Sequence, residues 1–137
     1  MREGYRKLGL DAQVTPFISD MASALGHADL IIARSGAMTV SEIAAAARAA
    51  IFVPYPFHRD RQQESNAQVI EKLGGAVVIR DDDQLADNLE IAIEKLIADP
   101  AQLVAMGRRA YGAAKPDGAA AIARLCFEIA DRRRLGA

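Results

Sequence analysis

The sequence contains one cysteine, no tryptophan and two histidines among 137 residues. A single thiol excludes an intramolecular disulfide framework, and so few cysteines and histidines argue against a metal cluster. We therefore expect neither a metal site nor a cofactor. Cys126 shares a helical stripe with Ile122, Leu125 and Ile129, so we expect it to pack in the core.

The sequence also lacks a charge excess and a long apolar run. Seventeen Lys and Arg residues oppose 18 Asp and Glu residues, giving a formal net charge of −1. This balance argues against a basic surface that binds nucleic acid. No apolar run approaches the roughly 20 residues of a membrane span, and residues 1–5 lack the apolar core of a signal peptide. We expect one cytoplasmic domain, and its 51% hydrophobic content is sufficient for a core.

Short β-type runs alternate with helical patterns along the chain. The runs lie at about 13–15, 30–33, 51–53 and 76–79. Helices are expected over about 20–25, 39–47, 60–73, 83–97, from Pro100 after an N-cap at Asp99, and over 117–134. This order predicts parallel βαβ units, and hence an α/β fold with a Rossmann-like sheet flanked by helices.

The segment 34–42 (RSGAMTVSE) directly follows the apolar run 30–33. A helix that begins there directs unpaired N–H groups and its positive dipole end toward one point, which favours binding of a phosphate. Thr39 and Glu42 also match a capping box, in which both side chains bond to amides at the helix start. Taken alone, this common pattern favours the capping role for Glu42, but a ligand site remains the alternative.

A second polar segment, 54–67, follows the run 51–53. Two prolines predict an extended exit from the strand, and Asp60 with Gln63 predicts a helix N-cap. The amides of Gln62, Gln63 and Asn66 suit the hydroxyls of a sugar, since an amide both donates and accepts. Alternatively, they form the polar, solvated first turn of a helix.

Residues 17–21 follow the first β-type run and provide a third candidate. Ligands of open parallel sheets bind outside the carboxyl ends of the strands. Phe17, Ile18 and Met21 therefore either pack in the core or offer apolar surface and main-chain groups to a flat base.

These motifs make the chain resemble the bacterial glycosyltransferases that transfer N-acetylglucosamine (GlcNAc) from UDP-GlcNAc to lipid I, which gives lipid II of peptidoglycan. The resemblance rests on segments 14–18, 34–42 and 58–67, in order and at the expected spacing. It covers essentially the whole chain, but only the later part of the family's C-terminal, donor-binding domain. It implies the two-domain GT-B fold and an inverting, metal-independent transfer.

By resemblance, the ligand contacts follow the order of the donor molecule. The main chain of Ile18 binds uracil with Met21 nearby, Ala37, Met38 and Thr39 meet the diphosphate, Glu42 holds the ribose, and Gln62 and Gln63 hold the GlcNAc hydroxyls. The remaining candidate binding residues are Arg34, Ser35, Gly36, Val40, Ser41 and Asn66. We nominate no catalytic residue, because the base is expected on the acceptor domain and His58 has no identifiable partner.

The sequence departs from this family at two places. Ala47-Arg48-Ala49 stands where the family usually has Gly-x-Pro, so we expect a looser connection or a longer helix. The acceptor-binding N-terminal domain and the first two strands of the donor domain have no counterpart in residues 1–137, which predicts a gap in the sheet and unpaired strand edges.

We therefore expect a partial C-terminal domain that is inactive alone. Lipid I and the cytoplasmic face of the plasma membrane would be contacted only through the absent segments. The alternative is a non-catalytic nucleotide-sugar binding subunit of a split enzyme.

Overall fold

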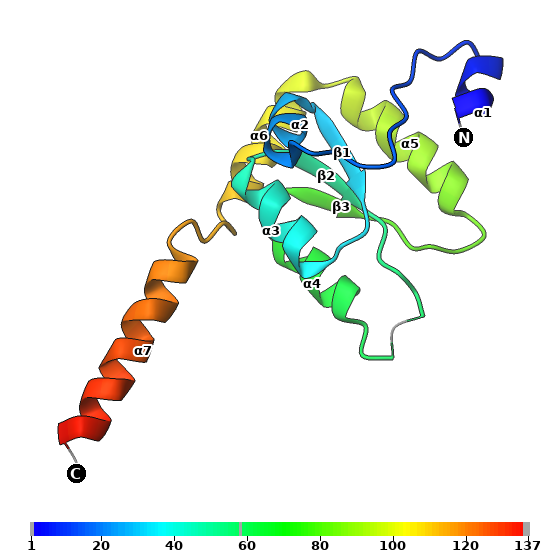
Figure 1. Cartoon of the computed structure of the whole chain (residues 1–137). Helices are drawn as coiled ribbons and strands as arrows, with labels where there is room; N and C mark the ends of the chain where they lie inside the picture. The colour runs from blue at the N-terminus through cyan, green and yellow to red at the C-terminus, as the bar shows by residue number, and fades with distance from the viewer. Residues whose placement is uncertain (1, 58, 136–137) are drawn as a thin grey trace.

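A computed structural model describes residues 2–57 and 59–135, and in them three parallel strands form one sheet in the order β1-β2-β3 (Figure 1). The strands are β1 (Leu30–Ala33), β2 (Ala49–Phe52) and β3 (Ala76–Val78). The helices in chain order are α1 (Arg2–Lys7), α2 (Met21–His27), α3 (Ala37–Ala45), α4 (Gln62–Glu71), α5 (Leu85–Ile97), α6 (Pro100–Tyr111) and α7 (Gly118–Leu135). This alternation confirms the predicted α/β fold.

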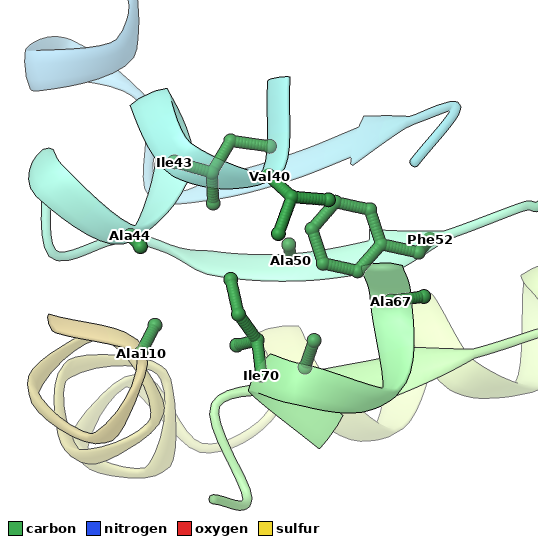
Figure 2. Close-up of a cluster of buried hydrophobic side chains, with 9 residues drawn as sticks. Val40, Ile43, Ala44, Ala50, Phe52, Ala67, Ile70 and Ala110 are labelled. Carbon is green, nitrogen blue, oxygen red and sulfur yellow. The ribbon is translucent and has the colours of Figure 1, made fainter. Parts of the chain in front are cut away.

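The core lies on both faces of β2, whose four residues are all buried. Phe52 packs on one face against Val40 and Ile43 of α3 and Ile70 of α4 (Figure 2). On the other face, α5 and α6 contribute Leu96, Leu103 and Met106 to a second cluster. A central parallel strand covered on both faces accounts for the uninterrupted apolar run at 49–53.

The N-cap predicted at Asp99 is confirmed, and a second aspartate caps α2 in the same way. The carboxylate of Asp20 accepts from the Ser23 amide at 2.9 Å, and that of Asp99 accepts from the Gln102 amide at 3.0 Å, so each aspartate caps its helix. The chain leaves α4 through Gly74, whose φ of +70° favours glycine.

The strand predicted at 13–15 is wrong. The Thr15 hydroxyl instead donates to the Phe17 carbonyl and accepts from the Phe17 amide at 3.2 Å, which forms a local turn. A strand needs a partner for its backbone groups, and β1 pairs only with β2 among the residues described. In place of the predicted gap, the outer edge of β1 has no strand paired to it among the residues described, and the Ile32 side chain is 47% exposed.

The connection from α3 to β2 is short, so the expected loosening or helix extension is wrong. α3 ends at Ala45, and Ala47 adopts a left-handed conformation with φ of +53°. The Ala47 amide donates to the Ala44 carbonyl at 3.0 Å, and the Arg48 amide to the Ile43 carbonyl at 3.4 Å. An alanine therefore adopts the backbone conformation that usually favours glycine after a helix.

Helix α7 projects away from the sheet (Figure 1). Its existence confirms the prediction, but Cys126 is exposed, and so are Ile122, Leu125 and Ile129. The expected core role of Cys126 is therefore wrong, because the described chain places no element against this stripe. None of the described helices is long and apolar enough to cross a membrane.

Candidate functional site

The carboxyl ends of the three strands meet at one edge of the sheet, and Arg34 connects them. Arg34 follows β1, and its Nη1 donates to the carbonyls of Val53 and Pro54 after β2, each at 3.2 Å. Its Nη2 lies 2.7 Å from Oδ2 of Asp81, which follows β3. The Arg34 charge is thus engaged by the protein itself.

Helix α3 begins at this edge, but its start differs from the prediction. Its first residue is Ala37, and the N-cap is Gly36, with extended backbone and no side-chain cap bond. Thr39 is already the third helical residue, so the Thr39–Glu42 capping box is wrong, and so is a helix start at residue 39. The N-terminus displays Ala37 and Met38, both exposed, while Val40 points into the core. The Ser41 hydroxyl donates back to the Ala37 carbonyl at 2.9 Å.

Ser35, Gln63 and Asn66 join the start of α3 to the start of α4. Ser35 is fully buried, and its Oγ donates to the Gln63 carbonyl at 2.7 Å. Asn66 Nδ2 donates to the Ser35 carbonyl at 3.1 Å. The predicted polar residues therefore do lie together, and these bonds fix the two helix starts relative to each other.

The α4 start also differs from the Asp60–Gln63 capping box, which is wrong. The N-cap is Arg61, in the left-handed region at φ of +49°. Asp60 still accepts from the Gln62 amide at 3.3 Å, but the side-chain oxygen of Gln63 accepts from the Tyr55 amide at 3.0 Å. Gln62 is exposed at the first helical position, and His58 lies outside the described residues.

Arg61 forms an ion pair with Glu64 one turn into α4. The hydrogen bond to Glu64, together with the carboxylate charge, raises the pKa of Arg61 above its ordinary value. This ion pair links the N-cap residue of α4 to the first turn of the helix.

Met21 and Glu42 line one groove of about 340 Å³ between α2 and α3. Its other lining residues are Ala22, Leu25, Gly26, Ala45 and Ala46. Phe17 is 78% exposed, and Ile18 and Met21 are exposed as well, so the alternative that these three form core is wrong. The structure thus places Glu42 and Met21 in the lining of one largely apolar groove.

Sequence reasoning missed Tyr55 and Asp81, which contact the predicted site residues. Ligands of parallel sheets bind outside the carboxyl ends of the strands, and the same rule, used for the β-type run at 76–79, identifies Asp81. In the described part of the chain, no group of His, Cys, Asp and Glu residues is arranged to hold a metal ion.

Comparison with known proteins identifies the family to which this chain is similar. Residues 1–122 match the glycosyltransferase family 28 C-terminal domain. A relative from Acidithiobacillus ferrooxidans is 43% identical over 129 residues, which are 94% of this chain and 36% of the relative. A Cupriavidus pinatubonensis relative is 43% identical over 95% of this chain and 36% of its own length. Both are named UDP-N-acetylglucosamine--N-acetylmuramyl-(pentapeptide) pyrophosphoryl-undecaprenol N-acetylglucosamine transferase.

A solved structure shares the fold. The crystal structure of Acinetobacter baumannii MurG superposes with a TM-score of 0.82 at 35% identity, over 92% of this chain and 38% of that chain. The chain thus spans a little over a third of the length of the curated relatives it matches, at 36%.

Proposed function

The chain belongs to the glycosyltransferase family 28 C-terminal domains, and on this premise we propose that it binds UDP-GlcNAc as the donor-binding part of an enzyme that transfers GlcNAc to lipid I. The observation that carries the proposal is that α3, the helix of Glu42, and α4, whose second residue is Gln63, begin next to each other at this edge, where Ser35 bonds to Gln63. Identity of 43% across 94% of the chain to GlcNAc transferases supports the same donor.

We assign the groups of the donor to individual residues of this site. The N–H groups at Ala37 and Met38 bind the diphosphate, where the helix dipole is favourable. Glu42, which lines the groove together with Met21, accepts from the ribose hydroxyls, and uracil lies toward Met21 and the main chain of Ile18. At the other end, Gln62 and Gln63 bind the sugar.

The two ends of the Gln63 side-chain amide have different roles. Its oxygen already accepts from the Tyr55 amide, so its NH₂ group is the part that donates to a GlcNAc hydroxyl. Arg34 and Ser35 contribute indirectly, since their side chains bond to protein carbonyls or to Asp81.

In the transfer, a hydroxyl of lipid I attacks the anomeric carbon of GlcNAc, and UDP leaves with inversion at that carbon. Negative charge grows on the diphosphate as the bond breaks, and the α3 amides stabilise it. We assign no base to these 137 residues. Contact with lipid I, and peripheral attachment to the cytoplasmic face of the membrane, belong to other parts of the enzyme.

Calorimetry and a transfer assay on the same preparation test this proposal. We expect the folded 137-residue chain to bind UDP-GlcNAc and UDP but to transfer no GlcNAc to lipid I above background. Glu42→Gln should weaken both ligands, whereas Glu71→Gln, at the far end of α4, should weaken neither. A cooperatively folded chain that gives no saturable heat at millimolar UDP-GlcNAc would refute the proposed function. Transfer of GlcNAc by the chain alone would refute the proposal that it binds the donor without supplying the acceptor site and the base.

The bare β1 edge favours a second candidate, a binding subunit completed by a separate polypeptide. Ile32 is half exposed there, and an unpaired parallel edge is a template for another strand. Adding the purified acceptor-binding domain of a relative should then produce transfer activity that neither part has alone. If the mixture stays inactive while both parts are folded, this candidate is rejected.

A further inference from the structure

Asp81 and Arg34 form a polar clamp that spans the exits of all three strands. The carboxylate of Asp81 lies 2.7 Å from Arg34 Nη2, and the side chains of Asp81 and Arg34 are only 27% and 49% exposed. The same guanidinium donates to the Val53 and Pro54 carbonyls through Nη1. The guanidinium of Arg34, which follows β1, thus bonds to the chain that follows β2 and pairs with Asp81, which follows β3.

The clamp continues to the sugar end of the donor site through Tyr55. The guanidinium carbon of Arg34 lies 5.7 Å from the centre of the Tyr55 ring, within the range of a cation–π contact. The Tyr55 amide in turn donates to the side-chain oxygen of Gln63. The orientation of the Gln63 amide therefore depends on where the chain at Pro54 and Tyr55 is held.

Pro54 is buried at the start of this loop, whereas residues 55–57 are exposed. Tyr55 and Phe57 are exposed and pack edge to face on each other, with ring centres 5.4 Å apart. Next to the loop is a cavity of about 540 Å³, lined by residues that include Pro54, Pro56 and Asp81. The Arg34 guanidinium bonds to the carbonyls of Val53 and Pro54 just before this exposed part, and charge-assisted hydrogen bonds of this kind are stronger than neutral ones.

We propose that Asp81 is a positioning residue for the sugar end of the donor site, acting through Arg34 on the loop that orients Gln63. The inference rests on the proposed function for the ligand, but the clamp itself is a property of the free chain. Without the carboxylate, Arg34 keeps only neutral carbonyl acceptors and is drawn toward water, so the loop loosens.

Amide hydrogen exchange in the free chain tests the clamp. Asp81→Asn should reduce protection of the Tyr55 amide by about 3- to 10-fold, the scale of a half-buried ion pair. Asp81→Glu, which keeps the carboxylate, should restore most of it. Asp83→Asn is the matched control, because this exposed aspartate undergoes the same charge change two residues away. Unchanged protection in Asp81→Asn, or equal loss in the control, would overturn the clamp.

Binding of two ligands separates positioning from a general loss of stability. Asp81→Asn should raise the Kd of UDP-GlcNAc by about 3- to 10-fold while the Kd of UDP changes less than about twofold, and Asp81→Glu should reverse this. Equal weakening of both ligands would overturn the positioning role. If the wild-type chain binds neither ligand, the proposed function and the positioning role fail, and the exchange result alone decides whether the clamp exists.

Discussion

Replacing Gly107 by alanine tests how closely α6 packs on the connection between α3 and β2. A Cβ at Gly107 would lie 2.1 Å from the Ala47 carbonyl oxygen, 2.9 Å from its carbon and 3.3 Å from the Arg48 Cα. All three are backbone atoms, so no side-chain rotation relieves the contact. The Ala47 backbone is in addition held by hydrogen bonds at the end of α3.

Helix propensity and steric overpacking change the free energy of unfolding of Gly107→Ala in opposite directions. Alanine is favoured over glycine inside a helix by about 1 kcal/mol. Against this, overpacking costs about 1–3 kcal/mol at typical core sites. A contact at 2.1 Å forces α6 outward by more than a side-chain adjustment. That shift also loosens Leu103 and Met106, which α6 buries beside Ala49. We therefore expect a gross cost of about 3–4 kcal/mol, above the typical range, and a net loss of about 2–3 kcal/mol in the free energy of unfolding of Gly107→Ala.

Denaturation with urea and heat, followed by circular dichroism, measures this difference. A loss of this size lowers Tm by about 6–12 °C for a domain of this length. Gly26→Ala in α2 is the matched control, because nothing lies within 4 Å of the added Cβ there. The control should gain about 0.5–1 kcal/mol from helix propensity. If both variants gain stability, the close approach of α6 to Ala47 is refuted.

Three further predictions concern the α3 end and the donor site. Ala47→Gly should stabilise the chain by about 0.5–1 kcal/mol in the same denaturation experiment, because glycine adopts a left-handed backbone without a Cβ penalty. A loss of stability would contradict the φ of +53° at this residue. Glu42→Ala should change stability by less than about 0.5 kcal/mol but weaken UDP by about 1.5–3 kcal/mol in calorimetry. The small stability change is expected because Gly36 occupies the cap, and the reverse outcome, lower Tm with unchanged affinity, would restore the capping role. Gln63→Glu keeps an acceptor for the Tyr55 amide and loses the donor. UDP-GlcNAc should therefore weaken by about 1–3 kcal/mol and UDP hardly at all; equal losses would place Gln63 in helix positioning only.

Sequence patterns predicted correctly those features that depend on a few neighbouring residues. The predicted cap at Asp99 forms because its carboxylate reaches the amide three residues ahead, a contact within one turn. The alternation of short apolar runs with helical patterns determined the parallel α/β order, since each pattern reflects the period of its own element. The same order places segments 34–42 and 54–67 at one edge of the sheet.

Contacts between distant segments were decided only by the tertiary structure. Thr39 and Glu42 have capping-box spacing, yet α3 begins at Ala37, directly after the extended Gly36, so Thr39 already lies inside the helix. The burial of Val40 and Ile43 against Phe52 sets which face of α3 points inward. The Gln63 oxygen bonds to Tyr55, eight residues earlier, where the folded loop returns to α4.

The sequence by itself determined strands β1 to β3, the approximate positions of helices α2 to α7 and the edge where the candidate site lies, since periodicity is local. It did not determine whether 13–15 pairs as a strand or whether the stripe at Cys126 is covered. Both depend on which surface lies opposite, because a strand needs hydrogen-bond partners and an apolar stripe needs a neighbour. The ion pair of Arg34 with Asp81 depends in the same way on the parallel sheet, which brings two residues far apart in the sequence to one edge.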